Sequence, residues 1–353
     1  MDMGPDTVNS SGFSPVIPVF ARKTLLFAAI LLSGVSLIFL PVFLMSCRPA
    51  RTSDRQVSGI FWAPENKWAA IVLKVKRKSR TYNECWIADP NLRPLRRCYS
   101  CIAPFGSPET VSFSPDGTAF CFAHMSVNGK KGYGVDARVV RVDLEKNLEE
   151  DEIAVLPDEI VLQMCVTTPS DIVFMRARDV RNLYVFSVGE KRMEPLFASP
   201  IHVPHFFYVD ASHNQCLLHG ELLLRVGHAY ADNYLWHVPV GKRNISPDSV
   251  LKEKIDSSLY AMTANRKIRL HVFPGETAIA FESGEVISHL DPGAYCFGRT
   301  KVVWFEKEKK NLCLGDEEGN VKVVLNILPE KAVTIAGFNE SLGIVCLEGK
   351  RDL

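Results

Sequence analysis

The feature that most constrains this chain is an uncharged apolar segment near its N-terminus. Between Lys23 and Arg48 no residue carries a charge. About 22 apolar residues, at a helical rise of about 1.5 Å each, give a length of about 33 Å, which matches a hydrocarbon core of about 30 Å. A buried helix of a soluble domain is the alternative, but such helices are shorter and carry a polar stripe. Residues 24–47 are therefore predicted to attach the chain to membrane lipid.

Two kinds of attachment fit this segment. One is a permanent single-pass transmembrane helix, and the other is a secretory signal. The segment ends in Leu44-Met45-Ser46-Cys47, which resembles the lipobox of bacterial lipoproteins, where a small residue precedes a cysteine that is lipidated. Leu44 and Ser46 match that pattern and Met45 departs from it. Cys47 is thus a candidate lipidation site, and its alternative is an ordinary thiol at the end of a membrane helix.

The charges beside the apolar segment bear on its orientation. Arg22 and Lys23 precede it, and Arg48, Arg51 and Arg55 follow it. The positive-inside count favours a cytoplasmic C-terminal domain, whereas the logic of a signal peptide places that domain outside. We predict the extracytoplasmic orientation, because the two basic residues before the segment directly adjoin it.

The rest of the chain is predicted to be one globular domain. Residues 1–23 are rich in Ser, Pro and Gly and are expected to be a disordered head, and residues 48–56 a linker. Residues 57–353 form the domain, and a hydrophobic fraction of 47% supports a sizeable core. Lys and Arg together number 41 against 40 Asp and Glu, so no basic excess indicates a nucleic-acid partner.

A repeated strand–turn–strand pattern organises this domain. Gly59–Leu73 and Val111–Ala123 both read as a strand, a proline-containing turn and a second strand, and Pro64 and Pro115 are 51 residues apart. This spacing is typical of propeller blades or solenoid units. In Pro115-Asp116-Gly117 the proline presets φ, the aspartate bonds its own backbone and the glycine accepts a positive φ.

Weaker copies of the pattern continue to the C-terminus and bring the count to about seven units. An outer strand follows most of them, so each unit holds about four strands and almost no amphipathic helix. Such a chain is predicted to form an all-β radial or stacked array.

Two motifs carry a family resemblance. The turn Phe113–Gly117 and the outer strand Leu183–Gly189 resemble the β-propeller repeats of the TolB type and of prolyl-oligopeptidase-family proteins. The resemblance implies a β-propeller, and the count of repeats gives it six or seven blades; a pair of β-sandwiches is the alternative. The last unit, from Lys331 onward, holds only two clear strands. We expect Val57–Phe61 to complete its sheet and close the ring, because an open strand edge invites unwanted pairing.

No catalytic motif accompanies the repeats. The sequence contains no Gly-x-Ser-x-Gly elbow, no His-Glu-x-x-His, no phosphate loop and no dinucleotide fingerprint. We therefore expect a membrane-anchored, non-catalytic module that binds a protein or peptide, with no cofactor and no metal. Two other classes stay open: a propeller that binds or processes a small molecule or glycan in its central channel, and a structural component of the cell envelope.

Clusters of histidine and basic residues have both functional and structural interpretations. A site in the central channel is one interpretation of the crowded histidines, and inter-strand hydrogen bonding is the other. The basic run Lys74–Arg80 is either the solvated end of a hairpin or a contact with anionic lipid headgroups. The channel-site candidates are His205, Asp210, His213, His228 and Asp232.

The ten cysteines resemble buried thiols more than a disulfide framework. Most stand singly inside apolar stretches, as Cys121 and Cys346 do. Cys98 and Cys101 form a Cys-x-x-Cys, but no second pair completes a zinc set. A local disulfide or two ordinary strand-end thiols are the interpretations that we favour over a redox or metal centre.

Deleting residues 1–47 is expected to release the rest of the chain from membranes, because no other apolar run exceeds the length of a strand. Fractionation of cells that express the full-length and truncated chains, with a high-salt wash, measures this. Truncated protein that stays with the washed membranes would reveal a second attachment.

Overall fold

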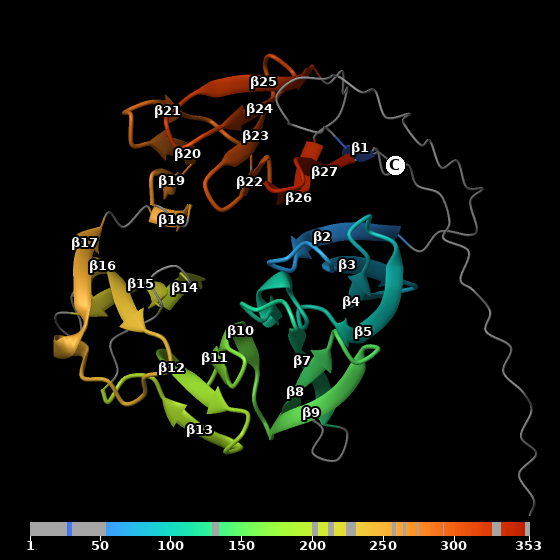
Figure 1. Ribbon diagram of the computed structural model, residues 1–353, viewed down its shortest axis with the longest axis vertical. Coiled ribbons are helices and arrows are strands. Elements are labelled where there is room, and N and C mark those ends of the chain that lie inside the picture. The colour runs from blue at the N-terminus through green and yellow to red at the C-terminus, as the bar shows by residue number, and fades with distance from the viewer. Residues whose placement is uncertain are drawn as a thin grey trace, which may run out of the picture.

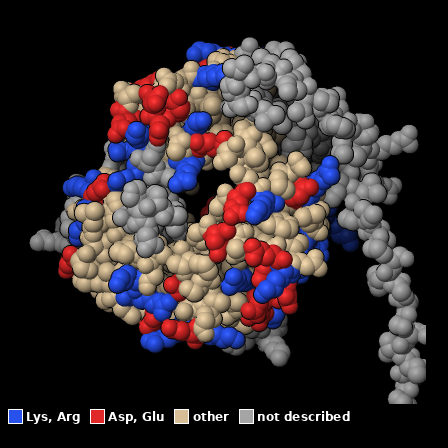
Figure 2. Space-filling model, in the orientation of Figure 1, with Lys and Arg blue, Asp and Glu red and all other residues tan. Residues whose placement is uncertain are grey.

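The described residues form a ring of antiparallel sheets around a central opening (Figure 1). Figure 2 shows the same opening in the space-filling view. The predicted all-β propeller is confirmed, because the sheets radiate from the opening instead of stacking as a sandwich. The computed structural model describes residues 27–29, 54–128, 134–199, 204–210, 215–223, 231–255, 259–263, 266–273, 275–291, 293–326 and 333–349.

The first three sheets each consist of four consecutive antiparallel strands. Their strands are β2 (Asp54–Trp62), β3 (Ala69–Arg77), β4 (Arg80–Ala88) and β5 (Pro94–Ile102), then β6 (Val111–Phe113), β7 (Ala119–Asn128), β8 (Gly134–Asp143) and β9 (Glu149–Leu156), and then β10 (Val161–Thr168), β11 (Asp171–Arg176), β12 (Asp179–Ser187) and β13 (Arg192–Pro195). In each sheet the first strand lies nearest the opening and the fourth lies at the periphery (Figure 1).

The next three sheets repeat this order, and a sheet of three strands follows them. The described residues thus hold six four-stranded sheets and one three-stranded sheet. The number to compare with these sheets is the predicted six or seven blades. The strands are β14 (Pro204–Asp210), β15 (Gln215–Leu223), β16 (Ala231–Pro239) and β17 (Leu251–Ile255), then β18 (Leu259–Met262), β19 (Ile268–Phe273), β20 (Glu276–Phe281) and β21 (Val286–Ile287), then β22 (Tyr295–Phe297), β23 (Val302–Glu306), β24 (Asn311–Gly315) and β25 (Val321–Asn326), and last β26 (Val333–Asn339), β27 (Ile344–Gly349) and β1 (Phe27–Ala29).

The turn between β6 and β7 shows how local chemistry sets the strands. Gly117 has a φ of +71°, and its N–H donates to the carbonyl of Ser114 at 2.9 Å. Asp116 Oδ1 accepts from the Thr118 N–H at 3.1 Å, and Ser114 Oγ accepts from the Ala119 N–H at 2.9 Å. These bonds satisfy the backbone groups that the reversal leaves unpaired, as the sequence predicted.

The core is divided among the interfaces between neighbouring sheets. Val72 and Ile87 of the first sheet pack with Phe120 and Val142 of the second. The third and fourth sheets enclose Trp236, the fifth and sixth enclose Trp304, and both indoles are fully buried. Each sheet is thus covered on both faces, and the stability of each blade depends on its two neighbours.

The ring does not close in the way the sequence suggested. Val57–Phe61 belongs to β2, which pairs with β3 in the first sheet, so our expectation that it completes the last sheet is wrong. The short turn between β2 and β3 favours the local partner, and the Ala63 N–H donates to the Trp68 carbonyl at 2.9 Å across it. The first and last sheets meet face to face instead, and Val57 and Ile60 pack with Ala336.

The closing contact depends on a glycine. A Cβ at Gly337 would lie 2.8 Å from both the Cβ and the carbonyl oxygen of Ile60. Only a residue without a side chain lets β26 approach β2 this closely. Beside it, the Asn339 amide donates to Asn66 Oδ1 at 2.7 Å, across 273 residues of sequence.

The predicted membrane segment is described only in part. Phe27–Ala29 form β1, which pairs antiparallel with Ile344–Cys346 of β27. These three residues are strand, where the sequence predicted helix. The remainder of residues 24–47, with Cys47, lies outside the described residues. Among the residues that are described, no helix is long and apolar enough to cross a membrane.

Substituting Gly337 with Ala is expected to lower the free energy of unfolding by about 1–3 kcal/mol, because the new methyl group collides with Ile60. Chemical unfolding of the full-length chain measures the change. Gly189→Ala is the matched control, since a Cβ at Gly189 meets no atom within 4 Å. Equal stabilities for the two variants would show that the first and last sheets do not press together at Gly337.

Candidate functional site

One face of the ring collects the features that point to binding. Four antiparallel strands return the chain to the face on which it started, so the first strand of every four-stranded sheet begins on the same face. We call this the proximal face, because β2 begins there. It carries the β3–β4 turn at residues 77–80 and the β5–β6 connection at residues 103–110.

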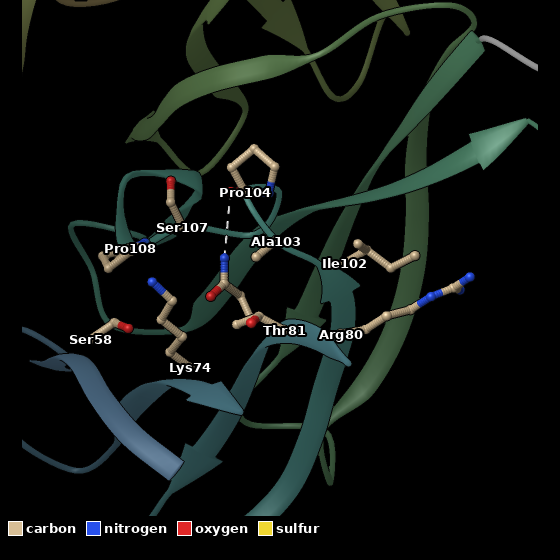
Figure 3. A pocket seen from close by; sticks show the side chains of 10 residues that line it. Ser58, Lys74, Arg80, Thr81, Ile102, Ala103, Pro104, Ser107 and Pro108 are labelled. Carbon is tan, nitrogen blue, oxygen red and sulfur yellow. Dashed lines mark hydrogen bonds between the residues drawn. The ribbon is translucent and has the colours of Figure 1, made fainter. Parts of the chain in front are cut away.

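A pocket of about 810 Å³ opens near this face, between the first sheet and the connection that follows it (Figure 3). Its floor comes from β3 and β4 and includes Lys74 and Thr81. Its wall is the connection from β5 to β6, which contributes Pro104 and Ser107. Because β3–β4 and this wall lie in different parts of the sequence, the fold must form before the pocket exists.

Asn83 joins the floor of the pocket to its wall. It pairs with Lys74 across β3 and β4 and is 8% exposed. Its amide nitrogen donates to the carbonyl of Phe105 at 2.8 Å. It also reaches the carbonyl of Pro104 at 3.5 Å, drawn as the dashed line in Figure 3. A buried amide with these partners fixes the wall, since leaving either group unpaired costs about 1–3 kcal/mol.

The charged groups of the pocket are all cationic. Among the described residues, Lys74 and Arg80 line it and no carboxylate does. Figure 3 shows the Lys74 amine reaching toward the space near Ser58 and Pro108, whereas Arg80 extends outward at the rim, beyond Ile102. Hydroxyl groups from the lining serine and threonine residues add hydrogen-bond donors. This combination favours an anionic group in the pocket.

The basic run extends the positive surface to the turn beside the pocket. Lys74, Lys76 and Lys78 are exposed. Arg77 is exposed too, but it forms an ion pair with Glu84, whose side chain is fully buried. The lysines therefore present their charge to solvent, while the Arg77 charge is compensated within the first sheet.

Three of the five residues proposed for a channel site are described, and they lie on two strands of the fourth sheet. His205 and Asp210 lie on β14, next to the opening, and Asp232 lies on β16, farther out (Figure 1). His213 and His228 lie outside the described residues. Within the described ranges, no group of three or more His, Cys, Asp or Glu residues is placed to hold a metal ion.

Sequence reasoning missed the pocket although it singled out part of it. Lys74 and Arg80 belong to the basic run, which was interpreted as either a solvated hairpin end or a lipid contact. The wall contributed by residues 103–108 gave no signal, because a Pro- and Gly-containing connection is typical of any propeller. Asn83 is the position that links the two, and its partners are visible only in three dimensions.

Comparison with known proteins supports the fold. The sequence matches no protein-family model, and no curated protein matches it. Prolyl oligopeptidase B from Galerina marginata, solved with a 25mer macrocyclization substrate, is 10% identical with a TM-score of 0.50; the match covers 80% of this chain and 44% of that one. This chain therefore spans less than half the length of that protein.

Two other solved propellers are similar. The propeller domain of the Trilobed protease from Pyrococcus furiosus is 15% identical with a TM-score of 0.46, and the match covers 80% of this chain and 89% of that one. The Swd1 propeller domain from Myceliophteria thermophila is 11% identical with a TM-score of 0.49, covering 86% and 100%. At these identities the comparison shows a shared propeller fold and nothing about function. The similar structures include one of the prolyl-oligopeptidase type.

Proposed function

We propose that this chain is a membrane-attached, non-catalytic β-propeller that binds an acidic segment of a protein or peptide in the proximal pocket. The observation that carries the proposal is the pairing of a cationic, carboxylate-free lining with a rigid wall. A carboxylate of the ligand would accept from Lys74, and neighbouring peptide groups would meet the hydroxyls. Exposed Ile102 at the rim offers an apolar contact to the same ligand.

The pocket lies close to the proposed membrane attachment along the chain. Seven residue steps separate Cys47 from Asp54, where β2 begins. At about 3.3–3.6 Å per residue they span at most about 25 Å. If residues 24–47 insert in the bilayer, the proximal face therefore stays within reach of its surface. An extracytoplasmic partner presented at the membrane surface is the ligand that this arrangement favours.

Membrane insertion and the pairing of β1 exclude each other. In the paired state Phe27–Ala29 are a strand of the last sheet, and residues of that sheet cannot at the same time belong to a helix that spans the bilayer. A helix that crosses the bilayer separates its ends by about 30 Å on opposite sides. We propose that the membrane-attached form leaves the edge of β27 without β1.

Charge reversal in the pocket tests ligand binding. Lys74→Glu is expected to weaken binding of a fluorescent hexaglutamate peptide about threefold to tenfold, or about 0.7–1.4 kcal/mol, because repulsion replaces attraction. Fluorescence anisotropy with the full-length chain in detergent measures the dissociation constant, and added salt should weaken binding further.

Lys191→Glu is the matched control, because Lys191 is exposed in the turn before β13, on the opposite face. It should leave the affinity within a factor of two of the unmodified chain. Equal affinities for the unmodified chain and Lys74→Glu, or equal losses in Lys74→Glu and Lys191→Glu, would contradict binding in this pocket. No binding to either chain would remove acidic peptides as the ligand class.

Hydrogen exchange distinguishes the two placements of the apolar segment. The amides of Ile344–Cys346 are expected to exchange equally fast in the membrane-bound full-length chain and in the released chain that lacks residues 1–47, because the inserted segment does not pair with β27. Mass spectrometry of the full-length and truncated chains reads these amides. Faster exchange confined to β27 in the truncated chain would place Phe27–Ala29 in the ring and argue against insertion.

A further inference from the structure

An irregularity in the first sheet brings two cysteines together. Cys85 on β4 pairs with Tyr99 on β5, and Trp86 pairs with Arg97, so Cys98 is an extra residue between the two pairs. In such a β-bulge, two residues of one strand face a single residue of the other. Cys98 is therefore a neighbour of Cys85 across the sheet, 13 positions away in sequence.

The same geometry excludes the partner that the sequence suggested. Cys98 and Cys101 lie on one strand, β5. Three residue steps of about 3.3 Å place their Cα atoms about 10 Å apart, which exceeds the separation of about 7 Å that a disulfide tolerates. Both thiols are free in the structure, so of the two interpretations of this Cys-x-x-Cys, two strand thiols is the one the structure supports.

The two thiols differ in their access to solvent. Cys85 is fully buried between the first and second sheets, beside Ile87 and Tyr99. Burial raises the pKa of the Cys85 thiol well above its ordinary value, and a side-chain hydrogen bond with Cys98 adds to this shift. Cys98 is half-buried. An oxidant that approaches from solvent therefore meets Cys98 first.

We infer that Cys85 and Cys98 form a redox-active pair that closes into a disulfide between β4 and β5 when a small disulfide such as glutathione disulfide is present. This goes beyond the proposed binding function and does not depend on it. The cross-strand placement of the thiols carries the inference, because closure needs only the side chains to turn toward each other.

The reaction balances in two exchange steps. The Cys98 thiolate attacks one sulfur of glutathione disulfide, forming a mixed disulfide and releasing one glutathione thiolate. The Cys85 thiolate then attacks the Cys98 sulfur, forms the protein disulfide and releases the second glutathione thiolate. Two electrons pass from the cysteine pair to glutathione disulfide, and the two protons of the thiols end on the released glutathione or in solvent.

Mass spectrometry tests the assignment. The full-length chain in detergent is equilibrated with glutathione buffers of increasing disulfide content, alkylated and digested. The expected product is a peptide pair that joins Cys85 to Cys98 and lacks two hydrogens. Cys98→Ser should abolish the link, and Cys85→Ala should stop the reaction at glutathionylated Cys98. Cys165→Ser, a half-buried cysteine opposite Val173 on another sheet, should leave the link unchanged.

The products formed by the unmodified chain test the assignment even if a variant does not fold. A link from Cys85 or Cys98 to Cys101, or glutathionylated Cys98 that never closes, would overturn the assignment. Free thiols at both positions under the most oxidising buffer would overturn it as well.

Discussion

The contact on which the ring depends is the one between its two ends, where β2 meets β26. Every other interface joins sheets that follow each other in sequence, so it forms with a short chain connection. This one brings Ile60 against Gly337 and Asn66 against Asn339 across more than 270 residues. β2 and β26 are packed face to face by apolar burial and by the hydrogen bond between Asn66 and Asn339, and the N-terminal strand β1 pairs with β27 in the last sheet. Without it, both end sheets would expose an apolar face.

Local chemistry explains which parts of the fold could be predicted. The turn at Ser114–Gly117 and its flanking strands follow from Pro, Asp and Gly at fixed offsets, and the structure has the predicted bond from the backbone to Asp116 and the positive φ at Gly117. The closing segment was misassigned because Val57–Phe61 has apolar residues suited to either neighbour. The local pairing of β2 with β3 excludes it from the last sheet, and the close approach of Gly337 to Ile60 could not be seen in the sequence, because the two residues lie at opposite ends of the domain.

The candidate site was predictable only in its charge. The basic run Lys74–Arg80 was evident in the sequence. Its two interpretations placed either solvent or anionic lipid headgroups beside Lys74. In the structure Asn83 holds the wall of the pocket through its hydrogen bond to the Phe105 carbonyl. In the sequence nothing distinguishes Asn83 from the other polar residues. Of the channel candidates that the structure describes, His205 and Asp210 lie on one strand and Asp232 lies two strands outward, so proximity in the sequence does not by itself place them on one strand.

The first sheet combines the pocket and the cysteine pair for one structural reason. β5 is its outer strand, so it has a ladder partner on one side only, and it leads directly into the wall of the pocket. The bulge at Cys98 interrupts that ladder and twists the exposed edge, which protects it from pairing with other chains. The same interruption weakens the hold of β4 on β5 beside the pocket wall. A covalent link at this position would therefore restrain β5 at one of the two irregularities in its ladder with β4, on the strand that leads into the wall.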